Sequence, residues 1–462
     1  MKKAIVFAGG GSKGAYQVGA WKALNELGQS FQIATGTSIG SINAAFYVQH
    51  DFDAAYQMWG ELTAGAIMTN GINMDRSFES IFSQRDQLVP FIKNYITSKG
   101  ADVTPFHERL RSFFSEEKFF TSEVDYALVT TEFPSMDPVV VRKADMRADP
   151  ANAWQWLAAS AACFPVFPVM EIGGKSYVDG GYYDNIPVAP AFSLGADEVV
   201  VVDLKTENNH EGYLRHPRVK YIKPSRDLGT FMNFEREVLD RSIRLGYNDT
   251  MKAYGRYYGT LYTFLPGADE SYYRELAALF MTLMTRMEAD YDFSGTVRFQ
   301  RINKSPGCAT LLAERCPRGQ EDEFHQFFAA LELYLKLLEK DDKPEYPLDD
   351  LLYELKSDVD GMYPMLEFSA ADAFDRVRRF AAEQTGKNNP ELKRFEDIRY
   401  AIVITSVARA LQQTGCGTAS EPVPREPREE EPMPSAIFDA LKGDLPLEAP
   451  AAEEPVKEEE TV

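Results

Sequence analysis

A serine in the segment Gly36-Thr37-Ser38-Ile39-Gly40 has the surroundings of an acyl-transfer nucleophile. A short apolar run precedes this segment, and a helical pattern follows it. In a nucleophile elbow the serine occupies a strained turn from strand to helix, which requires small residues two positions away on either side. Gly36 and Gly40 meet that requirement, and the helix start would direct N–H groups toward a reacting carbonyl. The pattern predicts Ser38 as a nucleophile with Thr37 and Ile39 beside it in the elbow, against the alternative of a purely structural turn.

A second glycine-rich segment follows the apolar run 3–8. It reads Gly9-Gly10-Gly11-Ser12-Lys13-Gly14. Consecutive glycines permit a tight turn and present unblocked N–H groups at a helix start, where they suit a phosphate or a developing oxyanion. The spacing also matches the dinucleotide fingerprint. However, residues 29–35 contain none of the acidic side chains that would bind the ribose, and no Gly-Lys-Ser/Thr follows to form a Walker A loop.

A third segment, Val178-Asp179-Gly180-Gly181, stands at the end of a predicted strand. Asp-Gly is a common turn dipeptide, so this segment by itself predicts a turn and nothing more.

The three segments, in this order, resemble the motifs of the patatin-like phospholipases. Two further blocks resemble the same family, Ala159–Pro168 with its Phe-Pro repeats and Asp184–Val188. The resemblance covers residues 3–205 and is carried by five blocks in register. It implies a three-layer α/β domain with a mainly parallel central sheet.

The resemblance also implies the roles of the site residues. Ser38 would be the nucleophile of a Ser–Asp dyad and Asp179 its base, with Gly180 and Gly181 completing the Asp-Gly-Gly motif. The oxyanion hole would come from the N-terminal glycine loop, which contributes Gly9, Gly10, Gly11 and Gly14. The implied activity is hydrolysis of acyl esters of phospholipids or lysophospholipids through an acyl-enzyme, without cofactor or metal.

Elementary chemistry agrees with such a dyad. A serine hydroxyl needs a neighbouring base before it attacks an ester carbonyl. A carboxylate serves if burial raises its pKa from ~3.9 toward the working pH. A Ser–His–Asp esterase or acyltransferase stays open as an alternative, because His210 and His216 follow Asp179 along the chain. Both lie in a polar stretch that predicts a surface loop. Asp184 and Asp203 are interpreted as turn or supporting residues.

The pattern of strands and helices must position these motifs. Short apolar runs alternate with amphipathic stretches over residues 1–205, which predicts an α/β domain with a mainly parallel sheet. Residues 55–122 read as a helical insertion, and residues 206–415 as a helical C-terminal domain. The predicted strands are Lys3–Ala8, Phe31–Thr35, Asp125–Thr131, Val139–Arg142, Met170–Ile172, Ser176–Val178 and Glu198–Asp203.

Composition narrows the choice of partners. The formal net charge is −21, which disfavours nucleic acid and anionic membranes as electrostatic partners. Residues 416–462 hold thirteen acidic and four basic residues among prolines, which predicts a disordered tail. Four scattered cysteines and the lack of a signal-peptide core or a spanning apolar run predict a cytoplasmic protein. Contact with a membrane or micelle surface would be transient.

Overall fold

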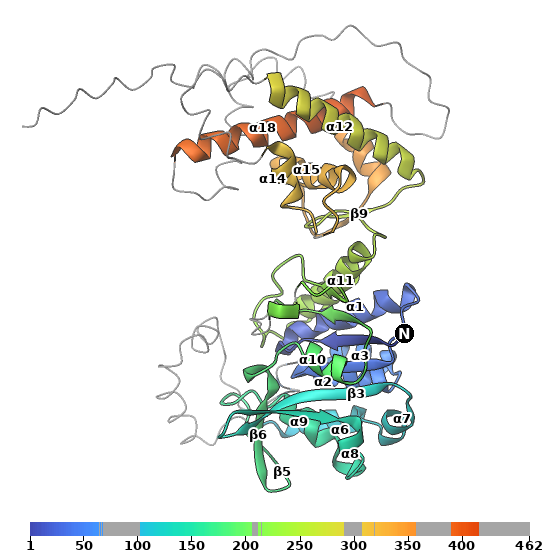
Figure 1. Ribbon diagram of the computed structural model, residues 1–462, viewed down its shortest axis with the longest axis vertical. Coiled ribbons are helices and arrows are strands. Elements are labelled where there is room, and N and C mark those ends of the chain that lie inside the picture. The colour runs from blue at the N-terminus through green and yellow to red at the C-terminus, as the bar shows by residue number, and fades with distance from the viewer. Residues whose placement is uncertain are drawn as a thin grey trace, which may run out of the picture. The chain divides into compact units, whose positions relative to one another are not determined.

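The computed structural model describes residues 1–63, 65, 67, 102–205, 211–213, 215–290, 307–317, 319–356 and 390–414. The chain divides into two compact units, Met1–Tyr254 and Gly255–Val462 (Figure 1). The predicted tail 416–462 and most of the segment 64–101 lie outside the described residues. None of the described helices is long and apolar enough to cross a membrane.

An eight-stranded mixed sheet forms the centre of the first unit. Its order is β5-β6-β3-β2-β1-β7-β8, and β4 pairs with β3 beside this path. The strands β3, β2, β1, β7 and β8 run parallel to one another, whereas β4 and β6 are antiparallel to β3 and β5 is antiparallel to β6. The bounds are β1 Lys3–Phe7, β2 Ile33–Thr37, β3 Asp125–Phe133, β4 Asp137–Arg142, β5 Met170–Ile172, β6 Lys175–Asp179, β7 Glu198–Val202 and β8 Val219–Ile222. This confirms the predicted α/β class with its mainly parallel sheet.

The short strand β2 shows why helical segments lie on both faces of the sheet. Successive side chains of a strand point to opposite faces. The Thr35 and Thr37 hydroxyls donate to the carbonyls of Pro187 and Asp184, which precede the start of α10 (Val188–Ser193). A Cβ on Gly36, which lies between them, would instead meet α2 (Ile39–Val48).

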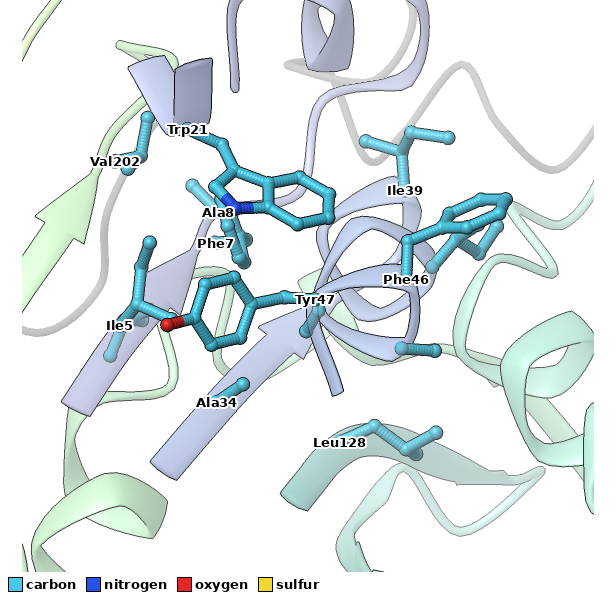
Figure 2. Close-up of a cluster of buried hydrophobic side chains, with 14 of the residues drawn as sticks. Ile5, Phe7, Ala8, Trp21, Ala34, Ile39, Phe46, Tyr47, Leu128 and Val202 are labelled. Carbon is cyan, nitrogen blue, oxygen red and sulfur yellow. The ribbon is translucent and has the colours of Figure 1, made fainter. Parts of the chain in front are cut away.

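Apolar side chains between the sheet and its helices form a continuous core. The helices of the first unit are α1 Ala15–Glu26, α2, α3 Phe52–Glu61, α6 Thr104–Phe113, α7 Glu116–Thr121, α8 Lys143–Met146, α9 Trp154–Ser160, α10 and α11 Arg236–Ala253. Figure 2 shows part of this core. The aromatic rings come from Trp21 of α1 and from Phe46 and Tyr47 of α2, and the strand side chains include Ile5, Ala34 and Leu128.

The expected domain division after residue 205 does not coincide with the end of the first compact unit at Tyr254. Strand β8 adds to the edge of the sheet beside β7, and α11 lies side by side with α1 (Figure 1). The two helices meet at glycines: a Cβ on Gly19 would stand 1.8 Å from the Ile243 carbonyl oxygen. Backbone contact this close ties residues 215–254 to the sheet.

The second unit is mainly helical. Its described elements are α12 Glu270–Asp290, α14 Cys308–Ala313, α15 Glu323–Leu337, α18 Pro390–Gln413 and the parallel strand pair β9 Thr263–Leu265 and β10 Glu345–Pro347. Its core is separate from that of the first unit and contains the buried rings of Phe280, Phe327 and Phe328. The predicted helical C-terminal region is thereby confirmed.

Candidate active site

Ser38 stands on a sharp turn between β2 and α2. Its backbone has φ 55° and ψ −132°, a positive φ that is costly for a residue with a side chain. The two flanking glycines make the turn possible. A Cβ on Gly36 would lie 2.2 Å from the Gly40 carbonyl oxygen, and one on Gly40 would lie 2.2 Å from that of Phe7. Any larger side chain at either position would force the turn apart.

The structure brings Ser38 and Asp179 together, although 140 intervening residues separate them in the sequence. The Ser38 hydroxyl donates to Asp179 Oδ2 at 2.6 Å. Asp179 is the last residue of β6, which pairs with β3 next to β2 in the sheet. The Gly181 N–H donates to Asp179 Oδ1 at 2.7 Å, so the carboxylate is held by the motif that follows it.

Burial changes the pKa of the Asp179 carboxyl. Only 6% of Asp179 is exposed, and burial raises the pKa of its carboxyl to about 6, against the lowering effect of the bonds from Ser38 and Gly181. A base with such a pKa is largely ionised at neutral pH, yet binds a proton far more readily than an ordinary aspartate does.

Two further serines hold the backbone of Ser38. The Ser38 N–H donates to Ser160 Oγ at 2.9 Å, and the Ser160 hydroxyl donates to the Val129 carbonyl at 2.7 Å. The Ser41 hydroxyl donates to the Ser38 carbonyl at 2.6 Å. Sequence reasoning assigned no role to Ser160, although it lies in the Ala159–Pro168 block, and its fully buried hydroxyl links the elbow to β3.

Gly9, at the start of the glycine loop, lies next to Ser38. A Cβ on Gly9 would stand 3.1 Å from Ser38 Cβ. Asn185 fixes Gly9 from both sides, since its carbonyl accepts the Gly9 N–H at 3.0 Å and its Nδ2 donates to the Gly9 carbonyl at 3.1 Å. Asn185 was also assigned no role from the sequence, although it belongs to the Asp184–Val188 block.

The other glycines of the loop differ in their surroundings. The N–H groups of Gly10 and Gly11 have no acceptor among the residues that the structure describes, and both glycines are partly exposed. Gly11 has φ 57°. Gly14 is buried, and a Cβ there would lie 2.8 Å from both Ile39 Cγ1 and the Trp59 ring. Two N–H groups of the loop are therefore available to an acceptor, whereas Gly14 allows close packing.

The remaining sequence candidates make other contacts. Asp184 Oδ1 accepts the Ile186 N–H at 3.1 Å, and Asp203 Oδ1 accepts that of Lys205 at 2.9 Å. The His216 ring packs against Phe192 and Tyr213. His210 lies outside the described residues.

Within the described part of the chain, no histidine is hydrogen-bonded to Ser38 or Asp179. The same residues contain no cluster of histidine, cysteine and carboxylate side chains that could hold a metal ion.

Part of the chain is similar in sequence to known proteins. Residues 5–192 match the family model described as patatin-like phospholipase. Lysophospholipase NTE1 of Coccidioides immitis (strain RS) is 26% identical over 212 residues, which are 45% of this chain and 12% of that protein. Patatin-like phospholipase domain-containing protein 6 of Homo sapiens is 24% identical over 207 residues, 44% of this chain and 13% of that protein. The chain thus matches only a small part of either relative's length.

Among solved structures, VipD from Legionella pneumophila is similar with a TM-score of 0.36 and 14% identity, over 90% of this chain and 92% of that one. The type III effector protein ExoU is similar with a TM-score of 0.30 and 12% identity, over 96% and 93%.

Proposed function

Residues 5–192 place this chain in the patatin-like phospholipase family, and we propose that it hydrolyses acyl esters of phospholipids or lysophospholipids with Ser38 as nucleophile and Asp179 as base. The observation that carries this proposal is the 2.6 Å hydrogen bond from the Ser38 hydroxyl to a buried carboxylate whose pKa is raised to about 6. A hydroxyl that already donates to a base can transfer its proton as it attacks.

The first half of the reaction forms an acyl-enzyme. Asp179 accepts the Ser38 proton while the serine oxygen attacks the ester carbonyl. The carbonyl oxygen becomes an oxyanion, which the N–H groups of Gly10 and Gly11 stabilise, by about 3–4 kcal/mol per donor in other hydrolases. The intermediate collapses, and Asp179 gives its proton to the departing alcohol.

The second half releases the fatty acid. Asp179, ionised again, takes a proton from water as the water attacks the acyl-enzyme. The same N–H groups stabilise the second oxyanion, and the proton returns to Ser38 as the acid leaves. One carboxylate therefore acts as base and acid in turn, which a pKa near 6 permits at neutral pH.

The lipid surface is the proposed partner. Tyr182 and Tyr183 follow Gly181 and are 36% and 46% exposed, and tyrosine suits a boundary between apolar and aqueous surroundings. The net charge of −21 opposes anionic surfaces, so contact would be transient and with zwitterionic lipid.

A lipid panel tests the function. The full chain is incubated with phosphatidylcholine, lysophosphatidylcholine and a neutral glyceride in micelles, and released fatty acid is measured beside Ser38→Ala. We expect release from at least one phospholipid and none above background from the variant. A folded wild-type protein that releases no fatty acid from any substrate would refute the proposal.

A histidine-dependent reaction would be exposed by His210→Ala and His216→Ala. The dyad predicts unchanged turnover in both variants, and a collapse in either would favour a Ser–His–Asp site. Nucleotide binding by the glycine loop predicts a thermal shift with NAD or NADP, which the proposed hydrolase does not.

A further inference from the structure

The glycine loop is bonded to a segment that lies far along the chain. We call residues 225–235, between β8 and α11, the strap. The Ser12 N–H donates to the Phe231 carbonyl at 2.7 Å, and the Ser12 hydroxyl donates to the Thr230 carbonyl at 3.0 Å. Ser12 is only 3% exposed. The strap lies beyond residues 5–192, the part that matches the family model.

The strap also touches the loop at the glycine that precedes Ser12. A Cβ on Gly11 would stand 2.1 Å from the Phe231 carbonyl oxygen and 3.2 Å from the Phe231 ring. Gly11 has a positive φ of 57°, a backbone conformation that glycine adopts readily, and its lack of a side chain allows this close contact with the strap. The direction of the neighbouring N–H groups therefore depends on where the strap lies.

The strap is itself tied down along its length. At its start the Ser225 N–H donates to Asp249 Oδ2 at 2.8 Å, and two residues further on the Asp227 carbonyl accepts from Arg241 Nη2 at 2.9 Å. Directly after its end, Arg236 Nη1 donates to the Trp59 carbonyl at 2.8 Å.

The helix α11 supplies all three of these side chains, and it is itself packed against α1. A Cβ on Gly246 of α11 would stand 1.9 Å from the Tyr16 carbonyl oxygen of α1, and the Tyr16 hydroxyl donates to Asp249 at 3.2 Å. The helix α1 begins directly after the glycine loop. The strap, α11 and α1 are thus connected to one another by direct contacts, and both the strap and α1 are connected to the loop.

We propose that the strap is the positioning element of the oxyanion loop, and that Ser12 transmits its position through two hydrogen bonds. Donors for an oxyanion act only if they are held in place before the reaction. The two carbonyls fix the residue next to Gly11 and so aim the Gly10 and Gly11 N–H groups. This inference rests on the proposed hydrolase function.

The test compares Ser12→Ala with Ser242→Ala in the full-length protein. Each variant removes one buried serine hydroxyl that donates to a backbone carbonyl, and the Ser242 bond to Val238 measures 2.8 Å within α11. We expect kcat for a p-nitrophenyl ester to fall about 10-fold in Ser12→Ala with KM within twofold of the parent. Ser242→Ala should keep the parent kcat.

A spectroscopic readout separates positioning from general destabilisation. A fluorophosphonate places a phosphonyl oxygen on Ser38 where the oxyanion would form. Its ³¹P resonance should be the same in the wild type and Ser242→Ala, and displaced in Ser12→Ala. Thr230→Gly, which keeps the carbonyl but loosens the strap, should displace the resonance as well and provides the measurement if Ser12→Ala does not fold.

Equal kcat and equal ³¹P shifts in Ser12→Ala, Thr230→Gly and Ser242→Ala would overturn the positioning role while leaving the hydrolase intact. A wild-type protein that neither hydrolyses esters nor forms the adduct would instead overturn the proposed function.

Discussion

Asp179 in the first unit and Glu332 in the second are buried to the same extent, each with 6% of its surface exposed. Glu332 Oε1 accepts three backbone N–H groups, from Thr260, Leu261 and Tyr262, at 2.5, 2.8 and 3.0 Å. Asp179 accepts one backbone N–H and the hydroxyl of Ser38. Burial alone therefore does not distinguish a reactive carboxylate. The difference lies in the donors, because a backbone N–H keeps its proton and a serine hydroxyl in a strained elbow can give it up.

Replacing the base gives the largest expected effect. In Asp179→Asn the side chain keeps its shape but cannot accept the Ser38 proton. We expect ester hydrolysis to fall by roughly 10⁴-fold, as for other residues that act as a unit with a nucleophile. Initial rates with a p-nitrophenyl ester measure the loss, and circular dichroism confirms the fold. Residual activity above a tenth of the parent rate would contradict the role of Asp179.

Replacing Glu332 should lower the stability of the second unit and leave the activity unchanged. Glu332→Ala leaves three N–H groups of the second unit without their acceptor, and an unsatisfied buried group costs ~1–3 kcal/mol. We expect unfolding of the second unit at lower urea concentration, with kcat of the remaining folded protein unchanged. A drop in kcat when all of the Glu332→Ala protein is folded would contradict a purely structural role for Glu332.

The pH dependence sharpens the comparison further. The folded pKa of Asp179, about 6, lies above its ordinary value of 3.8, so this group stabilises the folded state fully below about 3.8 and loses that contribution as the pH rises through about 6. Between pH 4 and pH 7 the wild type should lose roughly 2 kcal/mol more unfolding free energy than Asp179→Asn. Urea unfolding of both proteins across this range measures the difference, and parallel curves would contradict the raised pKa.

Activity should move the other way with pH. The base must be ionised to accept the Ser38 proton, so kcat/KM should rise tenfold per pH unit below about 6 and level off above it. A profile whose midpoint lies near 7.5 or higher would point to a different base.

The smallest effect is expected from the support of the elbow. Ser160→Ala removes the acceptor of the Ser38 N–H, and we expect kcat to fall about 10-fold, with stability reduced by ~1 kcal/mol. Ser406→Ala is the matched change in the second unit, because this serine is fully buried and its hydroxyl donates to the Ile402 carbonyl at 2.8 Å. Equal kcat values in Ser160→Ala and Ser406→Ala would show that Ser160 does not support Ser38 in the reaction.

The sequence predicted the parts of the site that depend on local geometry. An elbow needs small residues at fixed positions around the serine, so Gly36 and Gly40 mark it without knowledge of the fold. Asp179 is different, because Asp-Gly-Gly alone indicates a turn and only the other motifs gave it a role. Its distance to Ser38 depends on how β6 pairs with β3, which no local pattern specifies.

The supporting residues lacked such a signal. The Ser160 hydroxyl bonds to Ser38 and the Asn185 carboxamide bonds to Gly9, and each of these partners is more than 100 residues away. Gly19 and Gly246 look like ordinary helix glycines until α1 and α11 are seen to touch. The strap carried no recognisable motif because it contributes backbone carbonyls, which every residue possesses.

Labelling with a fluorophosphonate tests the central claim most directly. The full-length protein is treated with the probe at pH 7.5 and digested, and the modified residue is identified by mass spectrometry. The account predicts a single adduct on Ser38, much slower labelling in Asp179→Asn, and none in Ser38→Ala, which also loses ester hydrolysis. An adduct on another serine, or a Ser38→Ala protein that hydrolyses p-nitrophenyl esters at the parent rate, would contradict it.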